Sequence, residues 1–318
     1  MPHPITSVVA VGESLVDVIV PSDGAPITEH PGGSPMNVAL GIARLGRPVT
    51  LVTRIGSDRR GTAIAEHLSS AGAQLARGSV RDEPTSTATA QIRADGSAKY
   101  AFDLRWSLPQ GFTVADPVIA DAGIVHVGSI GAFLEPGGSA VAELLSQLSA
   151  TASPPIVTLD PNIRPSVVHD HTAALARFEQ LARSTAVVKL SDEDAAWLYP
   201  GTGLDETVDL ILALGPGVVA LTLGGAGALM ATRSTRLTVP GIAVEVADTI
   251  GAGDSFMSAM IHQLGVLLDA GVSTEELRDG TAVNAERLAL IGEFAVRCAA
   301  ITVSRDGANP PTLAELVR

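Results

Sequence analysis

Residues 248–256 read Asp248-Thr249-Ile250-Gly251-Ala252-Gly253-Asp254-Ser255-Phe256, and a long apolar run with helical spacing follows them. Gly251 and Gly253, with the small Ala252 between them, allow the backbone to approach a ligand closely. We expect a helix to begin here, so that its free first amides and the positive end of its dipole form an anion site. Asp254 falls in the first turn of that helix. There it can serve as a capping carboxylate, or as a base beside a transferred phosphoryl group.

A second glycine turn precedes another amphipathic run. Residues 30–39 read His30-Pro31-Gly32-Gly33-Ser34-Pro35-Met36-Asn37-Val38-Ala39. Gly32 and Gly33 can turn backbone amides toward a ligand, and the side chain of Asn37 offers both a donor and an acceptor to hydroxyl groups. A glycine turn also starts many helices that bind nothing. This motif alone therefore leaves both interpretations open.

Short apolar runs alternate with longer amphipathic runs through most of the chain. Buried parallel strands are apolar on both faces, which describes residues 7–11, 49–55, 124–127, 156–160, 186–190 and 218–223. Apolar residues recur at helical spacing in residues 36–45, 62–71, 139–149, 172–183, 206–214 and 255–268. The alternation predicts an α/β fold with a doubly wound, mostly parallel central sheet flanked by helices.

Two stretches, residues 14–31 and 85–106, break this alternation. Polar residues interleave with apolar ones in the second stretch, and residues 94–97 (Ala-Asp-Gly-Ser) are a turn signal. Half-polar strands do not suit a buried sheet, so we expect a small β-sheet lid over the strand ends, where ligands bind in open α/β folds. Periodicity alone also allows surface hairpins without a role. The core would then comprise residues 1–13, 32–84 and 107–318.

Composition narrows the class of protein. The chain has 318 residues, is 46% hydrophobic and carries a net charge of −13 without a run of basic residues, so we expect no nucleic-acid partner. The single cysteine, Cys298, lies in an apolar run and is expected to be a buried thiol rather than a nucleophile. We expect no membrane span and no leader segment, and hence a cytoplasmic protein.

The two glycine motifs together resemble the PfkB family of carbohydrate kinases, whose fold is ribokinase-like. The first family signature, Gly-Gly, then Asn-x-Ala, then Ala-Arg-Leu-Gly, is present at Gly32, Gly33, Asn37, Ala39 and residues 43–46. The second, Asp-Thr-x-Gly-Ala-Gly-Asp, is matched at residues 248–254. The resemblance runs from residue 11 to residue 310. It implies an enzyme that transfers a phosphoryl group from ATP to a small sugar with Mg²⁺.

The resemblance also implies roles for individual residues. Asp254 would be the catalytic base, and Gly251, Ala252 and Gly253 would hold the developing negative charge. The residues implied for the sugar are Asp17, Gly32, Gly33, Asn37 and Asp160, and Arg164 would contact phosphate. Those implied for the nucleotide are Lys189, Ser191, Thr222, Gly224, Gly227, Asn284, Gly307 and Asn309. A K⁺ ion would be bound by Asp248 together with backbone oxygens of Ile250, Thr302, Arg305 and Gly307.

One motif departs from the family pattern. Many members carry Lys-x-Asn-x-x-Glu, in which the polar pair orders the water around magnesium, whereas this chain has Lys189-Leu190-Ser191-Asp192-Glu193-Asp194. Fructokinase-like members often show such a variant, so the motif favours that branch. It leaves open whether Glu193 or Asp194 meets the magnesium waters, and acids in a first helical turn also suit the helix dipole alone.

The prediction of the substrate depends on the charged and aromatic residues near the lid. We expect fructose or a similar neutral ketose. A 2-keto-3-deoxygluconate kinase would need a cation for the substrate carboxylate, for which Arg105 is the candidate. A nucleoside kinase would need aromatic stacking, for which Tyr100, Phe102 and Trp106 could serve, although aromatic residues are 3% of the chain. The third alternative is a non-catalytic sugar-binding regulator, which would not need Asp254.

Exposed lid edges predict a homodimer formed through the lid.

Overall fold

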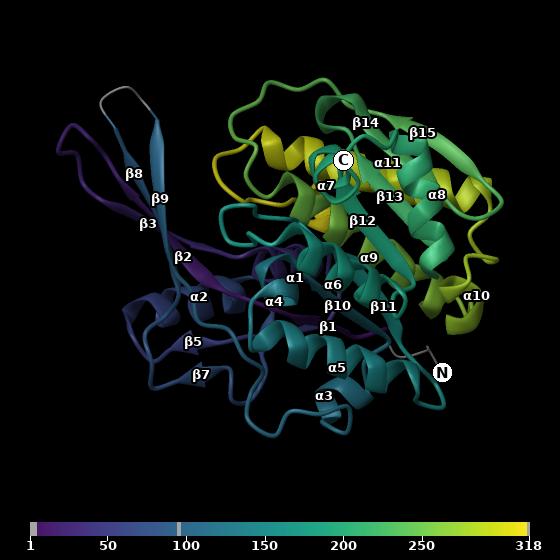
Figure 1. Ribbon diagram of the computed structural model, residues 1–318, viewed down its shortest axis with the longest axis horizontal. Helices are drawn as coiled ribbons and strands as arrows, with labels where there is room; N and C mark the ends of the chain where they lie inside the picture. The colour runs from purple at the N-terminus through teal and green to yellow at the C-terminus, as the bar shows by residue number, and fades with distance from the viewer. Residues whose placement is uncertain (1–4, 94–96, 317–318) are drawn as a thin grey trace.

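The computed structural model describes residues 5–93 and 97–316, and it consists of a large layered core from which a small sheet projects (Figure 1). The central sheet has nine strands in the order β15-β14-β13-β12-β11-β10-β1-β4-β6. Strands β13 to β6 in this order run parallel, and β14 and β15 add an antiparallel edge. The bounds are β1 Val8–Val11, β4 Val49–Val52, β6 Gln74–Leu75, β10 Ile124–Gly128, β11 Ile156–Asp160, β12 Val187–Ser191, β13 Val218–Thr222, β14 Gly227–Ala231 and β15 Arg236–Pro240.

Helices cover both faces of this sheet because alternate side chains of each strand enter two separate cores. One core joins the sheet to α1 Ser34–Arg44, α2 Arg59–Ser70, α9 Ala252–Asp269, α10 Thr274–Arg278, α11 Ala285–Val303 and α12 Leu313–Leu316. The other joins it to α3 Pro117–Ala120, α4 Ser129–Phe133, α5 Gly137–Ser149, α6 His171–Ala182, α7 Asp192–Leu198 and α8 Leu204–Leu214. The doubly wound α/β prediction is confirmed.

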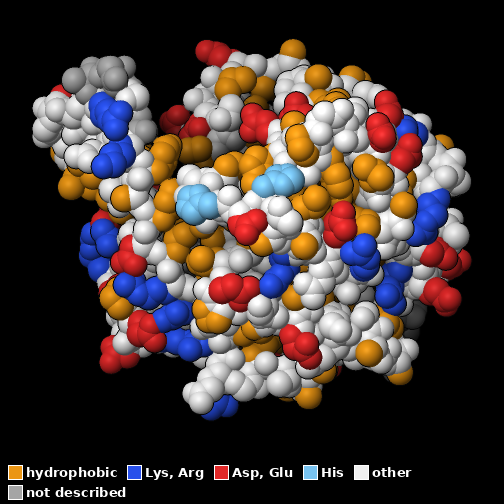
Figure 2. Space-filling model, in the orientation of Figure 1, with side chains coloured by type: hydrophobic (Ala, Val, Ile, Leu, Met, Phe, Trp, Pro, Cys, Tyr) orange, Lys and Arg blue, Asp and Glu red, His pale blue; other side chains and the backbone are white. Residues whose placement is uncertain are grey.

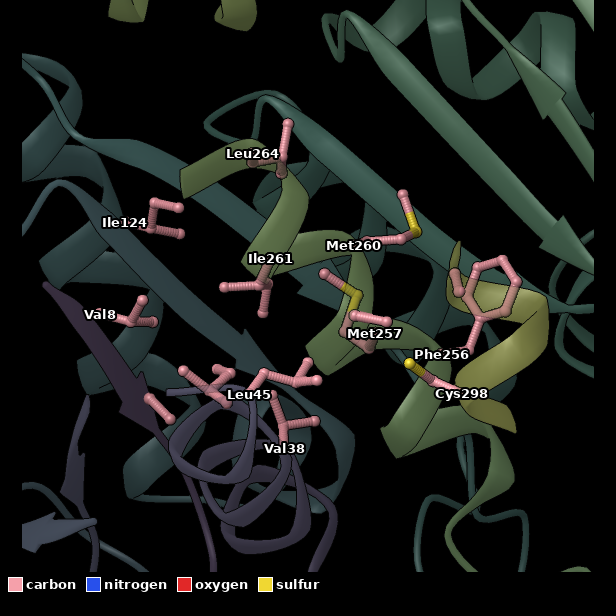
Figure 3. Close-up of a cluster of buried hydrophobic side chains, with 14 of the residues drawn as sticks. Val8, Val38, Leu45, Ile124, Phe256, Met257, Met260, Ile261, Leu264 and Cys298 are labelled. Carbon is pink, nitrogen blue, oxygen red and sulfur yellow. The ribbon is translucent and has the colours of Figure 1, made fainter. Parts of the chain in front are cut away.

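Helix α9 is the central element of the first core. Its buried side chains Phe256, Met257, Met260, Ile261 and Leu264 face α1, the strands β1 and β10, and Cys298 of α11 (Figure 3). This packing fixes the axis of α9 and therefore the position of its first turn. Cys298 is buried as expected, and burial raises the pKa of its thiol to about 12.

Four strands form the lid, in the order β3-β2-β8-β9. Their bounds are β2 Leu15–Val20, β3 Thr28–Gly32, β8 Thr87–Ile92 and β9 Ala98–Asp103. Two antiparallel hairpins, β2–β3 and β8–β9, are joined by parallel pairing of β2 with β8, and they extend side by side away from the core (Figure 1). Of the predicted turn at 94–97, residues 94–96 lie outside the described residues, but the amide of Arg93 donates to the carbonyl of Ser97 at 2.8 Å.

Several predictions from the sequence need correction. The run 49–55 is not one strand, because β4 ends at Val52 and the chain then leaves the sheet. Ile55–Gly56 (β5) pairs instead with Val80–Arg81 (β7) in a separate two-stranded sheet. Neither the antiparallel pair β14–β15 nor the 19-residue helix α11 was predicted, although part of α11 was noted as an apolar run. The short turn η1 Gly224–Ala226 joins β13 to β14.

Strand order reverses between β1 and β10. From β1 the chain builds outward to β4 and β6, and later strands are added on the other side. Crossovers diverge at such a switch point, so the loops after β1, β10 and β11 leave a crevice at the carboxyl ends of the strands. Among the residues described, no helix combines the length and the apolar character that crossing a bilayer requires.

Candidate active site

A cleft of about 610 Å³ lies where the lid meets the carboxyl ends of the central strands. In the space-filling view the lid is a separate lobe, set off from the main body by a notch (Figure 2). The lid contributes one wall of the cleft, the loops after β1, β10 and β11 another, and the start of α9 the floor. Its lining includes Glu13, Leu15, Asp17, Gly33, Ser34, Asn37, Ala88, Tyr100, Phe102, Ser129, Ile130, Asn162, Arg164, Ser166, Glu193, Thr249, Ile250, Gly251, Gly253 and Asp254.

Asp254 is held in a fixed orientation on the floor of the cleft. Its Oδ1 accepts a hydrogen bond of 2.6 Å from the Ser34 hydroxyl, and its Oδ2 accepts one of 2.8 Å from the Asn37 side-chain amide. Both donors come from the first turn of α1, so α1 and α9 together position this carboxylate. No hydrogen-bond partner is found for the buried Oδ1 of Asn37 among the described residues, which leaves an acceptor for a hydroxyl group.

The turn before α9 presents backbone amides to the same cleft. Gly251 caps the helix in the left-handed conformation, with φ +76°, and a Cβ there would lie 2.7 Å from the Cβ of Ala308. Only glycine suits this position. The first amides of a helix have no intrahelical acceptor, and α9 directs them, with the positive end of its dipole, toward the space beside Asp254. Ala252 belongs to this first turn, although Gly251 and Gly253 form the lining.

Polar groups of the lid complete the opposite side. Asp17 on β2 lies across from His30 on β3, and a Cβ on Gly32 would come within 2.3 Å of its carboxylate, so glycine leaves this acid free to accept hydrogen bonds. Burial raises the pKa of Asp17, and the positive charges of His30 and Arg164 partly offset that rise. Four carboxylates therefore line the cleft, Glu13, Asp17, Glu193 and Asp254, and Asp17 is the one that the lid supplies.

The loop after β11 and the start of α7 bring two further charged residues to the cleft, Arg164 and Glu193. The neighbouring Asp194 has a different role. Its Oδ1 accepts from the amide of Ile163 at 2.7 Å, and its Oδ2 accepts from the amide and hydroxyl of Ser191 at 3.0 and 2.8 Å. Ser191 and Asp194 thus form the capping box of α7 and hold the loop that carries Arg164. This geometry favours Glu193 over Asp194 as the group that reaches ligands.

Asp160 and Lys189, expected at the sugar and the nucleotide, do not line the cleft. Both side chains are buried, and the Lys189 ammonium lies 2.9 Å from Asp160 Oδ2. Burial raises the pKa of Asp160 to about 6, although Lys189 partly offsets the rise; the pKa of Lys189 is also raised, because Asp160 and Asp194 outweigh its own burial. The two side chains form a buried ion pair. It lies directly behind the first turn of α9, where a Cβ on Gly253 would be 2.9 Å from the Lys189 nitrogen.

Arg105, the candidate cation for a substrate carboxylate, also lies away from the cleft. Tyr100 and Phe102 of β9 line the cleft, and strand alternation directs Asp103 to the other side of the lid. Arg105 follows two residues after Asp103 and forms an ion pair of 3.0 Å with it. Burial lowers the pKa of Arg54, and the positive charges of Arg81 and Arg105 lower it further.

The other residues expected at the nucleotide do not lie in one place. Thr222, Gly224 and Gly227 lie at the turn between β13 and β14, and this turn contacts the segment 241–250, since the amide of Gly241 donates to Ala226. Asn284, in contrast, caps the opposite end of α11 and accepts from the amide of Arg287. A helix of 19 residues is about 28 Å long, so Asn284 is not near Gly307 or Asn309.

Residues expected at a monovalent cation do lie together. The Asp248 carboxylate accepts from the amides of Ile250 and Gly307, both at 3.0 Å, and so connects the turn before α9 to the loop after α11. The hydroxyl of buried Thr302 donates to Ser255 in the first turn of α9. The side chains of Arg305 and Asn309 contact other elements, Glu315 of α12 and Arg44 of α1 respectively.

Several residues of the cleft were not predicted from the sequence. They include Glu13, Ser34, Ser129, Asn162 and Ser166. Glu13 carried a signal, because it is an acid two residues after a buried strand, and Ser34 lies within the glycine motif at residues 30–39. Beyond the cleft, Ile242, Val244 and Val246 are exposed apolar residues that alternate along the segment leading to Asp248. Contiguous exposed apolar residues are typical of a binding surface, and the sequence alone did not predict one in this segment.

Comparison with known proteins places this chain in a family. The pfkB family carbohydrate kinase model matches residues 5–315. A fructokinase of Rhizobium leguminosarum bv. trifolii is 31% identical over 259 residues, which cover 80% of this chain and 78% of the relative. The fructokinase of Xylella fastidiosa with bound ATP has the same fold, with a TM-score of 0.82 at 24% identity, over 99% of this chain and 98% of that chain. The structure of a Vibrio cholerae fructokinase double mutant, with fructose, ADP and potassium bound, has a TM-score of 0.76 at 25% identity. The match covers 96% of this chain and 94% of that chain.

Proposed function

Because the chain belongs to the PfkB family of carbohydrate kinases, we propose that it transfers the terminal phosphoryl group of ATP to a hydroxyl of fructose or a similar neutral ketose. The observation that carries the proposal is the position of Asp254. It lies beside the free amides of α9, in a cleft that also holds Asp17 and Asn37. A protein that only bound sugar would have no use for a base beside an anion site.

The proposed chemistry uses these groups in sequence. Asp17 and the Oδ1 of Asn37 accept hydrogen bonds from sugar hydroxyls and thereby orient the sugar. Asp254 accepts the proton of the hydroxyl that attacks. The amides at Gly251 to Gly253 stabilise the negative charge that develops on the transferred group, and Arg164 contacts the phosphates. Magnesium, when bound, would neutralise phosphate oxygens, and the exposed carboxylate of Glu193 fits the water around that ion.

The nucleotide base would lie outside the sugar cleft. The turn at Gly224 is hydrogen-bonded to Gly241, where the exposed segment 241–250 begins, and Val244, Val246 and Ile250 are exposed apolar side chains of that segment. An apolar surface next to a glycine turn suits a flat purine ring. From there the phosphates would extend to the first turn of α9, where Asp254 lies.

Activation by potassium is expected from the fit of residues around Asp248. Its carboxylate already connects the 248–250 turn to Gly307, so a cation bound there would stabilise the anion site in the same place. We predict a higher kcat in potassium buffer than in tetramethylammonium buffer of equal ionic strength. Equal rates in the two buffers would exclude the cation site.

The substrate proposal rests on where the positive charges lie. Among the described residues that line the cleft, Arg164 is the sole arginine or lysine, and phosphate contact is its proposed role. Arg105 is paired with Asp103 on the other side of the lid. A sugar acid would therefore place its carboxylate in the cleft without a cation of its own, which is costly. Tyr100 and Phe102, stacked with ring centroids 6.1 Å apart, favour a nucleoside as the second candidate.

The test compares kcat/KM for D-fructose, 2-keto-3-deoxygluconate and adenosine in the wild type. We expect D-fructose to be preferred by at least tenfold, or about 1.4 kcal/mol in transition-state binding. Arg105→Ala is the matched control and should leave the ranking unchanged. A tenfold preference for the sugar acid that Arg105→Ala abolishes, or a preference for adenosine, would overturn the choice of substrate.

We propose in addition that two copies pair through their lids. Strands β3 and β9 are the edges of the lid sheet, and the lid exposes Ile19 and Tyr100. Open edges with apolar side chains favour pairing with another strand. The expected result is a scattering mass near twice 32.5 kDa, and a monomer mass at assay concentration would refute the dimer.

A further inference from the structure

Glu13 is an acid in the sugar cleft that takes no part in the proposed chemistry. It follows β1 at the switch point of the central sheet, and it lines the cleft although it is only 4% exposed. Its Oε2 accepts a hydrogen bond of 2.6 Å from the amide of Gly131. No lysine, arginine or histidine of the described residues forms an ion pair with it. A buried carboxylate without a cation is costly, so its retention calls for an explanation.

The hydrogen bond from Gly131 holds one wall of the cleft. Gly131 lies in α4, a five-residue helix whose N-cap residue, Gly128, has no side chain to satisfy the free amides of the first turn. Ser129, the first residue of α4, has φ +52°, which is unusual for a residue other than glycine. Ser129 and Ile130 line the cleft. Glu13 therefore supplies, from the loop after β1, the side-chain cap that this short helix lacks.

The same residue, Gly131, also contacts the end of the lid. The carbonyl of Gly131 accepts a 2.8 Å hydrogen bond from the indole nitrogen of Trp106, which is 2% exposed and follows the second lid hairpin. A Cβ on Gly131 would lie 2.8 Å from Glu13 Oε2 and 2.9 Å from the Cα of Gly12, so α4 and the loop after β1 are in close contact. One residue of α4, Gly131, thus connects the loop after β1 to the end of the lid, through its amide on one side and its carbonyl on the other.

We propose that Glu13 is a positioning residue for the sugar: through Gly131 it holds the Ser129–Ile130 wall and the Trp106 end of the lid in the places that the sugar contacts. This inference rests on the proposed function, because it concerns the sugar side of the same cleft. The nucleotide side, at the Gly224 turn and the segment 241–250, makes no part of this connection. Loss of the Glu13 carboxylate is therefore expected to act on sugar affinity and not on ATP affinity.

The kinetic test uses Glu13→Ala and Glu13→Gln with D-fructose and ATP. We expect Glu13→Ala to raise KM for the sugar at least tenfold while KM for ATP stays within threefold. Glu13→Gln should restore KM for the sugar to within threefold, because its amide oxygen can still accept from Gly131. Trp106→Phe, which keeps an aromatic ring and removes the donor, should raise KM for the sugar by a smaller factor. Equal changes in both KM values, or no rescue by glutamine, would overturn the proposal.

A second measurement does not depend on the identity of the substrate. Hydrogen exchange of the unliganded protein should speed up at least tenfold at residues 129–133 and 104–108 in Glu13→Ala. The control is Asp170→Ala, which removes the exposed N-cap of α6 and should change exchange only there. Unchanged exchange in both segments would overturn the role of Glu13. If the wild type phosphorylates no sugar but exchange is still faster in Glu13→Ala, only the proposed function is contradicted.

Discussion

Replacement of Asp254 by asparagine is expected to lower kcat by about 100- to 10,000-fold, which is the usual effect of losing a general base. The substitution keeps the size of the side chain and removes its charge. The introduced amide can still accept from Asn37 with its oxygen and donate to the Ser34 hydroxyl with its nitrogen, so the contact between α9 and α1 is retained. We therefore expect an unchanged fold and nucleotide affinity, with KM for ATP within threefold.

The alternative role for Asp254 is that of an ordinary acid in a first helical turn, which stabilises the helix dipole. Asp205→Asn provides the matched control, because Asp205 lies in the first turn of α8 and is not part of the cleft. That variant should leave kcat unchanged. If Asp254→Asn turns over within threefold of the wild type at saturating sugar, ATP and magnesium, Asp254 is not the base.

The parts of the site that could be predicted from the sequence are those in which backbone geometry demands a particular residue. Gly251 must be glycine because it adopts a left-handed conformation against Ala308, and Gly33 has φ +107° with Glu13 directly behind it. Such backbone constraints appear in the sequence as short glycine motifs, and Asp254 belongs to one of these motifs. The doubly wound fold was predictable for a similar reason, since strands that are buried on both faces are apolar throughout.

The parts that could not be predicted depend on which way a polar side chain points at the end of a strand. Asp17 and Asp160 are both acids on strands near the lid or the cleft, yet Asp17 faces the cleft and Asp160 pairs with Lys189 inside the core. The difference arises from the pairing of strands far apart in sequence. Likewise, Glu193 and Asp194 are adjacent, but Asp194 belongs to the capping box of α7 whereas Glu193 lines the cleft.

Replacement of Lys189 by methionine is expected to lower the free energy of unfolding by about 3–5 kcal/mol at pH 7.5, which is typical when one partner of a buried ion pair is removed. The reason is that Asp160, which is fully buried, would lose its cation. Its Oδ1 already has no hydrogen-bond partner among the described residues. Arg236→Met is the control, because Arg236 pairs with the exposed Asp205 and Asp209 and its loss should cost less than about 1 kcal/mol.

The pH dependence of this effect identifies its cause. In the wild type the pKa of Asp160 is already raised to about 6 from its ordinary value of 3.8, and the loss of Lys189 would raise it further. When the pKa of a carboxyl group is higher in the folded than in the unfolded state, the folded protein binds the proton more tightly. The free energy of unfolding therefore falls as pH rises from the unfolded-state pKa to the folded-state pKa. The loss of unfolding free energy in Lys189→Met should therefore be largest at pH 8 and become smaller toward pH 5.

The double variant Lys189→Met/Asp160→Asn should recover much of the lost unfolding free energy at pH 8, because no buried charge remains. A deficit that is independent of pH, or that the second substitution leaves in full, would mean that Lys189 stabilises the protein by packing alone.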